Sequence, residues 1–135
     1  MFAIDTNILI RFLVKDDIKQ AELVYQQFIQ AEKEKQAFFV PLLVVLELIW
    51  VLQSAYKISD QDIVSTLSDL LQMPVLKFEA PAILHQFINS ANKTNFDLSD
   101  VLIAHAALFS ECQKVLTFDK KASKFKHFKL LDKTS

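Results

Sequence analysis

The chain has 135 residues and a formal net charge of −1, and 52% of its residues are hydrophobic; this balance excludes a disordered chain and indicates one globular domain over residues 1–135. Glycine is absent from the sequence, which excludes the glycine-rich loops that bind dinucleotides or nucleoside triphosphates and the G-x-S-x-G turn of hydrolases. The single cysteine, Cys112, excludes an internal disulfide and a cysteine-based zinc site.

Short apolar runs alternate with helical patterns along the chain. The helical patterns predict helices over 6–15, 18–35, 41–52, 59–71, 80–92 and 99–112. The apolar runs predict strands over 2–4, 37–40, 75–78, 115–118 and 128–131. Because strands that alternate with helices usually pair in parallel, we predict an α/β fold with a mostly parallel central sheet flanked by helices.

The most apolar segment, 37–52, has 16 residues, which is short of the roughly 20 needed to span a bilayer. We therefore expect a buried strand and a helix that begins at Pro41, and no membrane contact. Glu47 is the lone charge in this helix. We expect its carboxylate to be buried, either paired with a lysine or bound to a metal. We expect Trp50 to lie in the core.

Four acidic positions follow predicted strands or lie on predicted helices. Asp5 and Asp119 follow strands directly, and ligands of parallel sheets bind at the carboxyl ends of strands. Asp97 and Asp100 lie at the start of the last helix, where either could also be a cap or favour the helix dipole. Taken with Glu47, they form an all-oxygen set whose mutual repulsion a cation would relieve, and such a set favours Mg²⁺ or Mn²⁺.

The end of the chain is basic: residues 114–135 contain seven lysines and two aspartates. These lysines could bind phosphates or could simply solvate the surface. A divalent ion held by carboxylates can activate water against a phosphodiester. The acids and the lysines together predict metal-assisted cleavage of a nucleic acid. No charged region precedes the N-terminal apolar run, so we expect no signal peptide and a cytoplasmic protein.

Four segments resemble the PIN-domain ribonucleases, and over its whole length the chain is similar to the VapC-type toxins of bacterial type II toxin–antitoxin pairs. The segments are the opening Met-Phe-Ala-Ile-Asp5-Thr6-Asn7-Ile-Leu, Pro41-x5-Glu47, Asp97-Leu-Ser-Asp100-Val-Leu-Ile-Ala and Thr117-Phe-Asp119. The sequence departs from relatives in having no glycine in its loops.

The resemblance implies that Asp5, Glu47, Asp100 and Asp119 bind the metal and are catalytic. It implies a supporting role for Asn7 and Thr117, with which we group Thr6, and a more peripheral one for Asp97. It further implies an endoribonuclease whose metal-activated water leaves a 5′-phosphate and a 3′-hydroxyl, a homodimer, and a small antitoxin protein that covers the site.

Three other interpretations stay open. A haloacid dehalogenase-like phosphatase also has an aspartate after its first strand, but Asn7 occupies the place of its second aspartate. A receiver-like signalling module would use a phospho-accepting aspartate after a middle strand and a downstream lysine. Neither accounts for Glu47 within an apolar helix. The set Asp5, Glu47, Asp100 and Asp119 argues against a catalytically inactive binding module.

Overall fold

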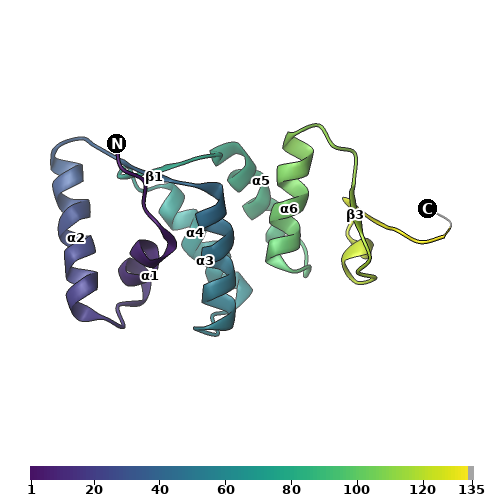
Figure 1. Cartoon of the computed structure of the whole chain (residues 1–135), viewed down its shortest axis with the longest axis horizontal. Helices are drawn as coiled ribbons and strands as arrows, with labels where there is room; N and C mark the ends of the chain where they lie inside the picture. Colours follow the sequence, from purple (N-terminus) through teal and green to yellow (C-terminus); the bar gives the residue numbers. More distant parts are fainter. Residues whose placement is uncertain (134–135) are drawn as a thin grey trace. The chain divides into compact units, whose positions relative to one another are not determined.

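The computed structural model describes residues 1–133, so the last two residues of the predicted lysine-rich end lie outside it. The chain forms two compact units, Met1–Pro81 and the residues from Ala82 onward. Residues 1–133 contain six α-helices and four short strands, and every strand pair is parallel (Figure 1). The predicted α/β class and the parallel pairing are therefore confirmed. The described strands form two separate two-stranded sheets, however, where one central sheet was predicted, and the predicted strand over 2–4 is reduced to a single bridge at Ala3.

The first unit opens with an extended segment in which Ala3 bridges to Phe39 in parallel. Its elements follow in the predicted order: α1 (Thr6–Val14), α2 (Ile18–Lys33), β1 (Phe38–Val40), α3 (Leu42–Ser54), α4 (Asp60–Leu71) and β2 (Leu76–Phe78). Strands β1 and β2 pair in parallel, with Phe38 opposite Leu76. The N-terminal segment thus lies beside β1, which places Asp5 at the carboxyl end of an extended segment.

Helices α1 to α4 pack around one core in this unit. Helix α1 contacts both α2 and α3, and α4 contacts α3 and β2 (Figure 1). Side chains with almost no exposed surface come from α1, β1, α3 and α4: Leu9, Ile10, Val40, Val45, Leu48, Ile49, Leu52, Ile63, Leu67 and Leu70. Helix α2 adds the buried side chains of Val24 and Phe28. Burial of this apolar set stabilises the unit.

Helix α3 has one buried and one exposed face. Glu47 is exposed, as are Leu43 (78%) and Trp50 (63%). Our predictions that Glu47 is buried and that Trp50 lies in the core were wrong. Leu43, Glu47 and Trp50 are spaced by four and three positions, so they lie on one face of the helix. The opposite face of α3 packs against the core. Among the described residues, no helix is long and apolar enough to cross a bilayer.

The second unit follows the same α/β pattern. Helix α5 (Pro81–Ala91) leads into it, followed by α6 (Leu98–Phe109), β3 (Val115–Thr117), the 3-10 turn η1 (Ala122–Lys124) and β4 (Phe128–Leu130). Strands β3 and β4 pair in parallel, with Val115 opposite Phe128. The core of this unit contains Leu84, Phe87, Leu98, Val101, Leu102, Ala104 and Phe125.

The lack of glycine affects how helices end. Four residues with side chains, Lys15, Lys35, Lys57 and Glu111, adopt positive φ values between 54° and 64° shortly after a helix. Glycine normally takes this left-handed conformation, which costs other residues roughly 1–2 kcal/mol. Helices α2 and α6 end at Lys33 and Phe109, before their predicted ends at 35 and 112.

Candidate functional site

Two acids of the second unit, Asp97 and Asp119, lie within electrostatic range of a third, Asp100. Asp97 caps α6, because its Oδ2 accepts a hydrogen bond from the backbone N–H of Asp100 at 3.3 Å. Asp100 lies in the first turn of α6 and is partly buried. Burial raises the pKa of the Asp100 carboxyl, and the negative charges of Asp97 and Asp119 raise it further. The ionised form of Asp100 is therefore disfavoured where it stands.

Asp119 lies just beyond the carboxyl end of β3 and is held by its neighbours. Its Oδ1 accepts hydrogen bonds from the backbone N–H groups of Lys121 at 2.8 Å and Ala122 at 3.1 Å. Its own N–H donates to the hydroxyl of Thr117 at 3.0 Å. Asp119 therefore orders the turn that leads to η1. Since both bonds use Oδ1, this role is compatible with an ion bound at the other oxygen.

Asp5 occupies the equivalent place in the first unit. It caps α1, because its Oδ1 accepts a hydrogen bond from the N–H of Ile8 at 3.3 Å. Thr6 is buried at 5% exposure and Asn7 is exposed, both in the first turn of α1. Glu47 lies on the exposed face of α3. Asp5 and Glu47 thus belong to the first unit, and Asp97, Asp100, Thr117 and Asp119 to the second.

The donor chemistry of the acids suits a hard divalent cation. Carboxylate oxygens are the ligands that Mg²⁺ and Mn²⁺ prefer, and a cation would relieve the repulsion that Asp97 and Asp119 exert on Asp100. Within residues 1–133, however, no three His, Cys, Asp or Glu side chains lie close enough together to hold one ion. The acids of the second unit alone therefore favour a cation without supplying a full set of ligands.

Arg11, the one arginine of the sequence, takes part in an exposed network of polar side chains. Its guanidinium forms a salt bridge with Asp16 at 3.0 Å and donates to the side chain of Gln20 at 2.6 Å. Asp16 also accepts a hydrogen bond from the Tyr56 hydroxyl at 2.8 Å. The pKa of Asp16 is lowered, first by this hydrogen bond and then by the charge of Arg11. Arg11 is therefore engaged in an exposed side-chain network of the first unit.

Sequence reasoning missed a basic group in the second unit. His105 and His127 lie with ring centroids 5.6 Å apart, and Lys126 adjoins them. The two histidines are far apart in the sequence and lack the spacing of metal ligands, so no local pattern marks them. Their pairing becomes visible through the packing of α6 beside the segment that precedes β4.

Comparison with known proteins identifies the class. The sequence model of the PIN domain family matches residues 2–128, so the chain belongs to the PIN domain family. The chain is also similar to a protein described as VapC ribonuclease from Aquifex aeolicus (strain VF5). The two are 25% identical over 124 residues, which cover 92% of this chain and 91% of that protein. The family resemblance predicted from the four acidic segments is confirmed.

Proposed function

We propose that the protein is a Mg²⁺- or Mn²⁺-dependent endoribonuclease and the toxin of a toxin–antitoxin pair in the cytoplasm. The PIN family match and the similarity to a VapC ribonuclease along most of both chains support an RNA-cleaving activity. The structural observation that carries the metal dependence is the position of Asp100, partly buried and under the negative charges of Asp97 and Asp119. A carboxyl group in that environment favours a cation beside it.

In this proposal, Asp5, Glu47, Asp100 and Asp119 would hold the ion, as the family resemblance implies. A divalent ion held there would supply Lewis-acid chemistry, which would activate water and compensate the negative charge that develops on the phosphodiester. Other residues of the chain hold these four carboxylates in position.

Each positioning residue acts through a local contact or its place in a helix. The hydroxyl of Thr117 accepts a hydrogen bond from the backbone N–H of Asp119 and so orients the end of β3. Asp97 caps α6 and thereby keeps Asp100 in an ordered first turn. Thr6 and Asn7 belong to the first turn of α1, next to Asp5. These contacts hold the carboxylates in place before substrate arrives, which lowers the cost of ordering them during the reaction.

The proposal extends to domain organisation and partners. The family match runs through both compact units, so we propose that residues 1–135 make up a single PIN-like domain. From the resemblance to VapC-type toxins we also propose that the protein forms a homodimer and that it binds a small antitoxin protein. The test co-expresses the protein with each short reading frame found beside its gene, and one of these frames should relieve any growth arrest that the protein causes. Arrest that no neighbouring frame relieves would contradict the pairing.

The decisive experiment measures cleavage of a single-stranded RNA by the full chain with Mg²⁺, with Mn²⁺ and with excess chelator. Asp5→Asn, Glu47→Gln, Asp100→Asn and Asp119→Asn are then compared one by one with the wild-type protein. Asp17→Asn is the matched control, because Asp17 also caps a helix but lies outside the proposed set.

We expect cleavage with either metal, none with chelator, and a loss of at least about 100-fold in each of the four variants, because each removes a charged ligand. Equal cleavage with and without chelator would overturn the metal mechanism. A variant that cleaves like Asp17→Asn would remove that acid from the site.

A further inference from the structure

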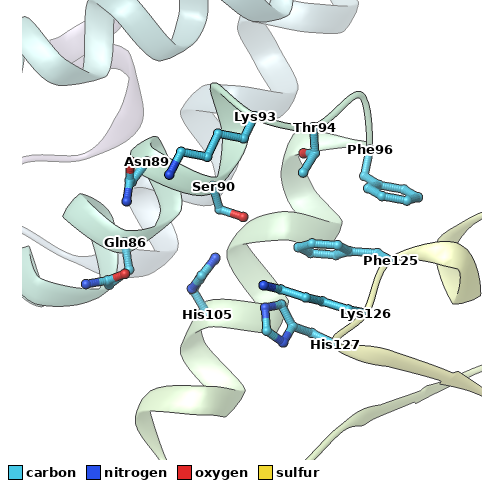
Figure 2. Close-up of a pocket in the computed structure, with 10 residues that line it drawn as sticks. All are labelled: Gln86, Asn89, Ser90, Lys93, Thr94, Phe96, His105, Phe125, Lys126 and His127. Carbon is cyan, nitrogen blue, oxygen red and sulfur yellow. The ribbon is translucent and has the colours of Figure 1, made fainter.

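The second unit contains a polar cavity of about 430 Å³ that none of the three acids lines. Its ten lining residues include two lysines, two histidines and four neutral residues with amide or hydroxyl groups, and none is acidic (Figure 2). The volume falls within the range of small-molecule sites. His105 follows Asp100 by five positions on α6, about 140° around the helix. The cavity therefore lies on a different face of α6 from Asp100.

Basic side chains gather at one place in this cavity. Figure 2 shows the side chain of Lys126 extending towards His105 and His127. Burial lowers the pKa of both imidazoles, and the charge of Lys126 contributes to lowering each of them. Lys93 is a second ammonium among the lining residues. Basic groups that crowd together without a lining carboxylate are stabilised by an anion.

Two buried polar atoms of the cavity lining have no hydrogen-bond partner in the described part of the chain. They are Nε2 of His105 and Oγ1 of Thr94. Buried polar groups in folded proteins are nearly always hydrogen-bonded, so an unpaired one calls for an explanation. A ligand that carries both donors and acceptors would satisfy both atoms.

An aromatic pair forms the other end of the cavity. Phe96 stacks on Phe125 with ring centroids 4.9 Å apart and an interplanar angle of 28°. Phe125 in turn meets the ring of His127 edge-on, with centroids 5.0 Å apart. Phe96 is partly exposed, whereas Phe125 is buried. An inorganic anion gains nothing from contact with these aromatic rings, whereas the planar base of a nucleotide can stack on them.

We propose that this cavity binds one nucleotide of a single-stranded RNA, with its phosphate at Lys126, Lys93 and His105 and its base against Phe96. The cavity is then a subsite that holds the RNA strand away from the scissile bond. This inference rests on the proposed function for the identity of the substrate, because an RNA nuclease needs such contacts along the strand. Lysine contacts to phosphate supply affinity with little sequence preference.

The test measures binding by the full chain in excess chelator, so that cleavage does not interfere. The probes are inorganic phosphate, adenosine monophosphate and a short single-stranded adenylate RNA, and the reporters are the ring signals of His105 and His127 in NMR spectra. We expect the monophosphate and the RNA to shift both rings, and inorganic phosphate to bind more weakly. Loss of a charged contact in Lys126→Gln should weaken RNA binding by about tenfold.

Lys77→Gln is the matched control, because Lys77 is an exposed lysine of the first unit. Equal RNA affinities of Lys126→Gln and Lys77→Gln, or unmoved histidine signals, would overturn the subsite. Inorganic phosphate that binds as tightly as the monophosphate would overturn the role of the base. Binding that fails while metal-dependent cleavage persists refutes the subsite alone. Binding that persists in a protein without ribonuclease activity refutes the proposed function instead.

Discussion

Asp5 combines a structural contact with a proposed catalytic role, and two substitutions separate them. Asp5→Asn keeps an oxygen that can accept the N–H of Ile8, whereas Asp5→Ala removes it. Asparagine caps helices about as well as aspartate. We therefore expect Asp5→Asn to lose RNA cleavage with little change in the free energy of unfolding. Asp5→Ala should lose cleavage and stability together.

The size of the stability loss follows from the capping geometry. Replacing a capping aspartate with alanine costs about 0.5–2 kcal/mol. The bond from Ile8 to Asp5 is long at 3.3 Å and lies at an exposed position, so we expect about 0.5–1 kcal/mol for Asp5→Ala. Asp17 caps α2 through a shorter bond of 3.0 Å to the N–H of Gln20. Asp17→Ala should therefore destabilise at least as much while leaving cleavage intact.

The assay is urea unfolding without metal, followed by circular dichroism, alongside RNA cleavage with Mg²⁺. With a slope of about 1–3 kcal/mol/M, the expected loss moves the midpoint by a few tenths of a molar or more. Wild-type cleavage by Asp5→Asn would refute the ligand role of Asp5. A stability loss in Asp5→Asn as large as in Asp5→Ala would refute the capping argument. Loss of cleavage in Asp17→Ala would show that the assay responds to stability rather than to the site.

Three further measurements test the electrostatics and the backbone. Because the folded state raises the pKa of Asp100, its stabilising contribution is present at low pH and lost as pH rises, so Asp100→Asn without metal should keep or raise the free energy of unfolding at pH 7. The His105 ring should titrate in NMR below its ordinary pKa of 6.5, since burial and nearby positive charge lower it. Lys35→Gly should raise stability by up to about 1 kcal/mol, because φ at Lys35 is 54°.

Each of these expectations has a clear contradictory outcome. A loss on the order of 3 kcal/mol in Asp100→Asn would mark Asp100 as half of a buried ion pair. A measured pKa of His105 at or above 6.5 would contradict the inference that burial and the charge of Lys126 lower it. Lys33→Gly, within the last turn of α2, is the control for Lys35→Gly and should destabilise. Equal effects of the two glycines would contradict the conformational argument.

The lysine-rich end gives one more prediction, about affinity rather than chemistry. Replacing several of its lysines with glutamine should weaken RNA binding and flatten its salt dependence while the cut position stays the same. Each lost phosphate contact should lower the log–log slope by about 0.7 for a single strand. An unchanged slope would favour lysines that only solvate the surface. The lysines to replace are Lys120, Lys121, Lys124 and Lys126.

The amino-acid sequence by itself determined the order and type of the elements. The apolar runs and amphipathic patterns that define them act over a few residues, so periodicity was enough to predict the six helices and four strands of residues 1–133 to within a few positions. The predicted strand over 2–4 forms only the bridge from Ala3 to Phe39. The helix caps are equally local: Ser59 accepts the N–H of Asp62, three residues on. Asp5 and Asp119 could be predicted from the sequence for the same reason, because each directly follows a predicted strand in the chain.

The tertiary structure alone decided which face of α3 is buried. Helix α3 is apolar nearly all round, so its composition did not show that Val45 and Leu48 face the core while Glu47 and Trp50 are exposed. That choice depends on the elements packed against α3. Likewise, His105 meets His127 because of packing between segments 22 positions apart. Such contacts arise from the burial of shared apolar surface, which no local pattern of residues encodes.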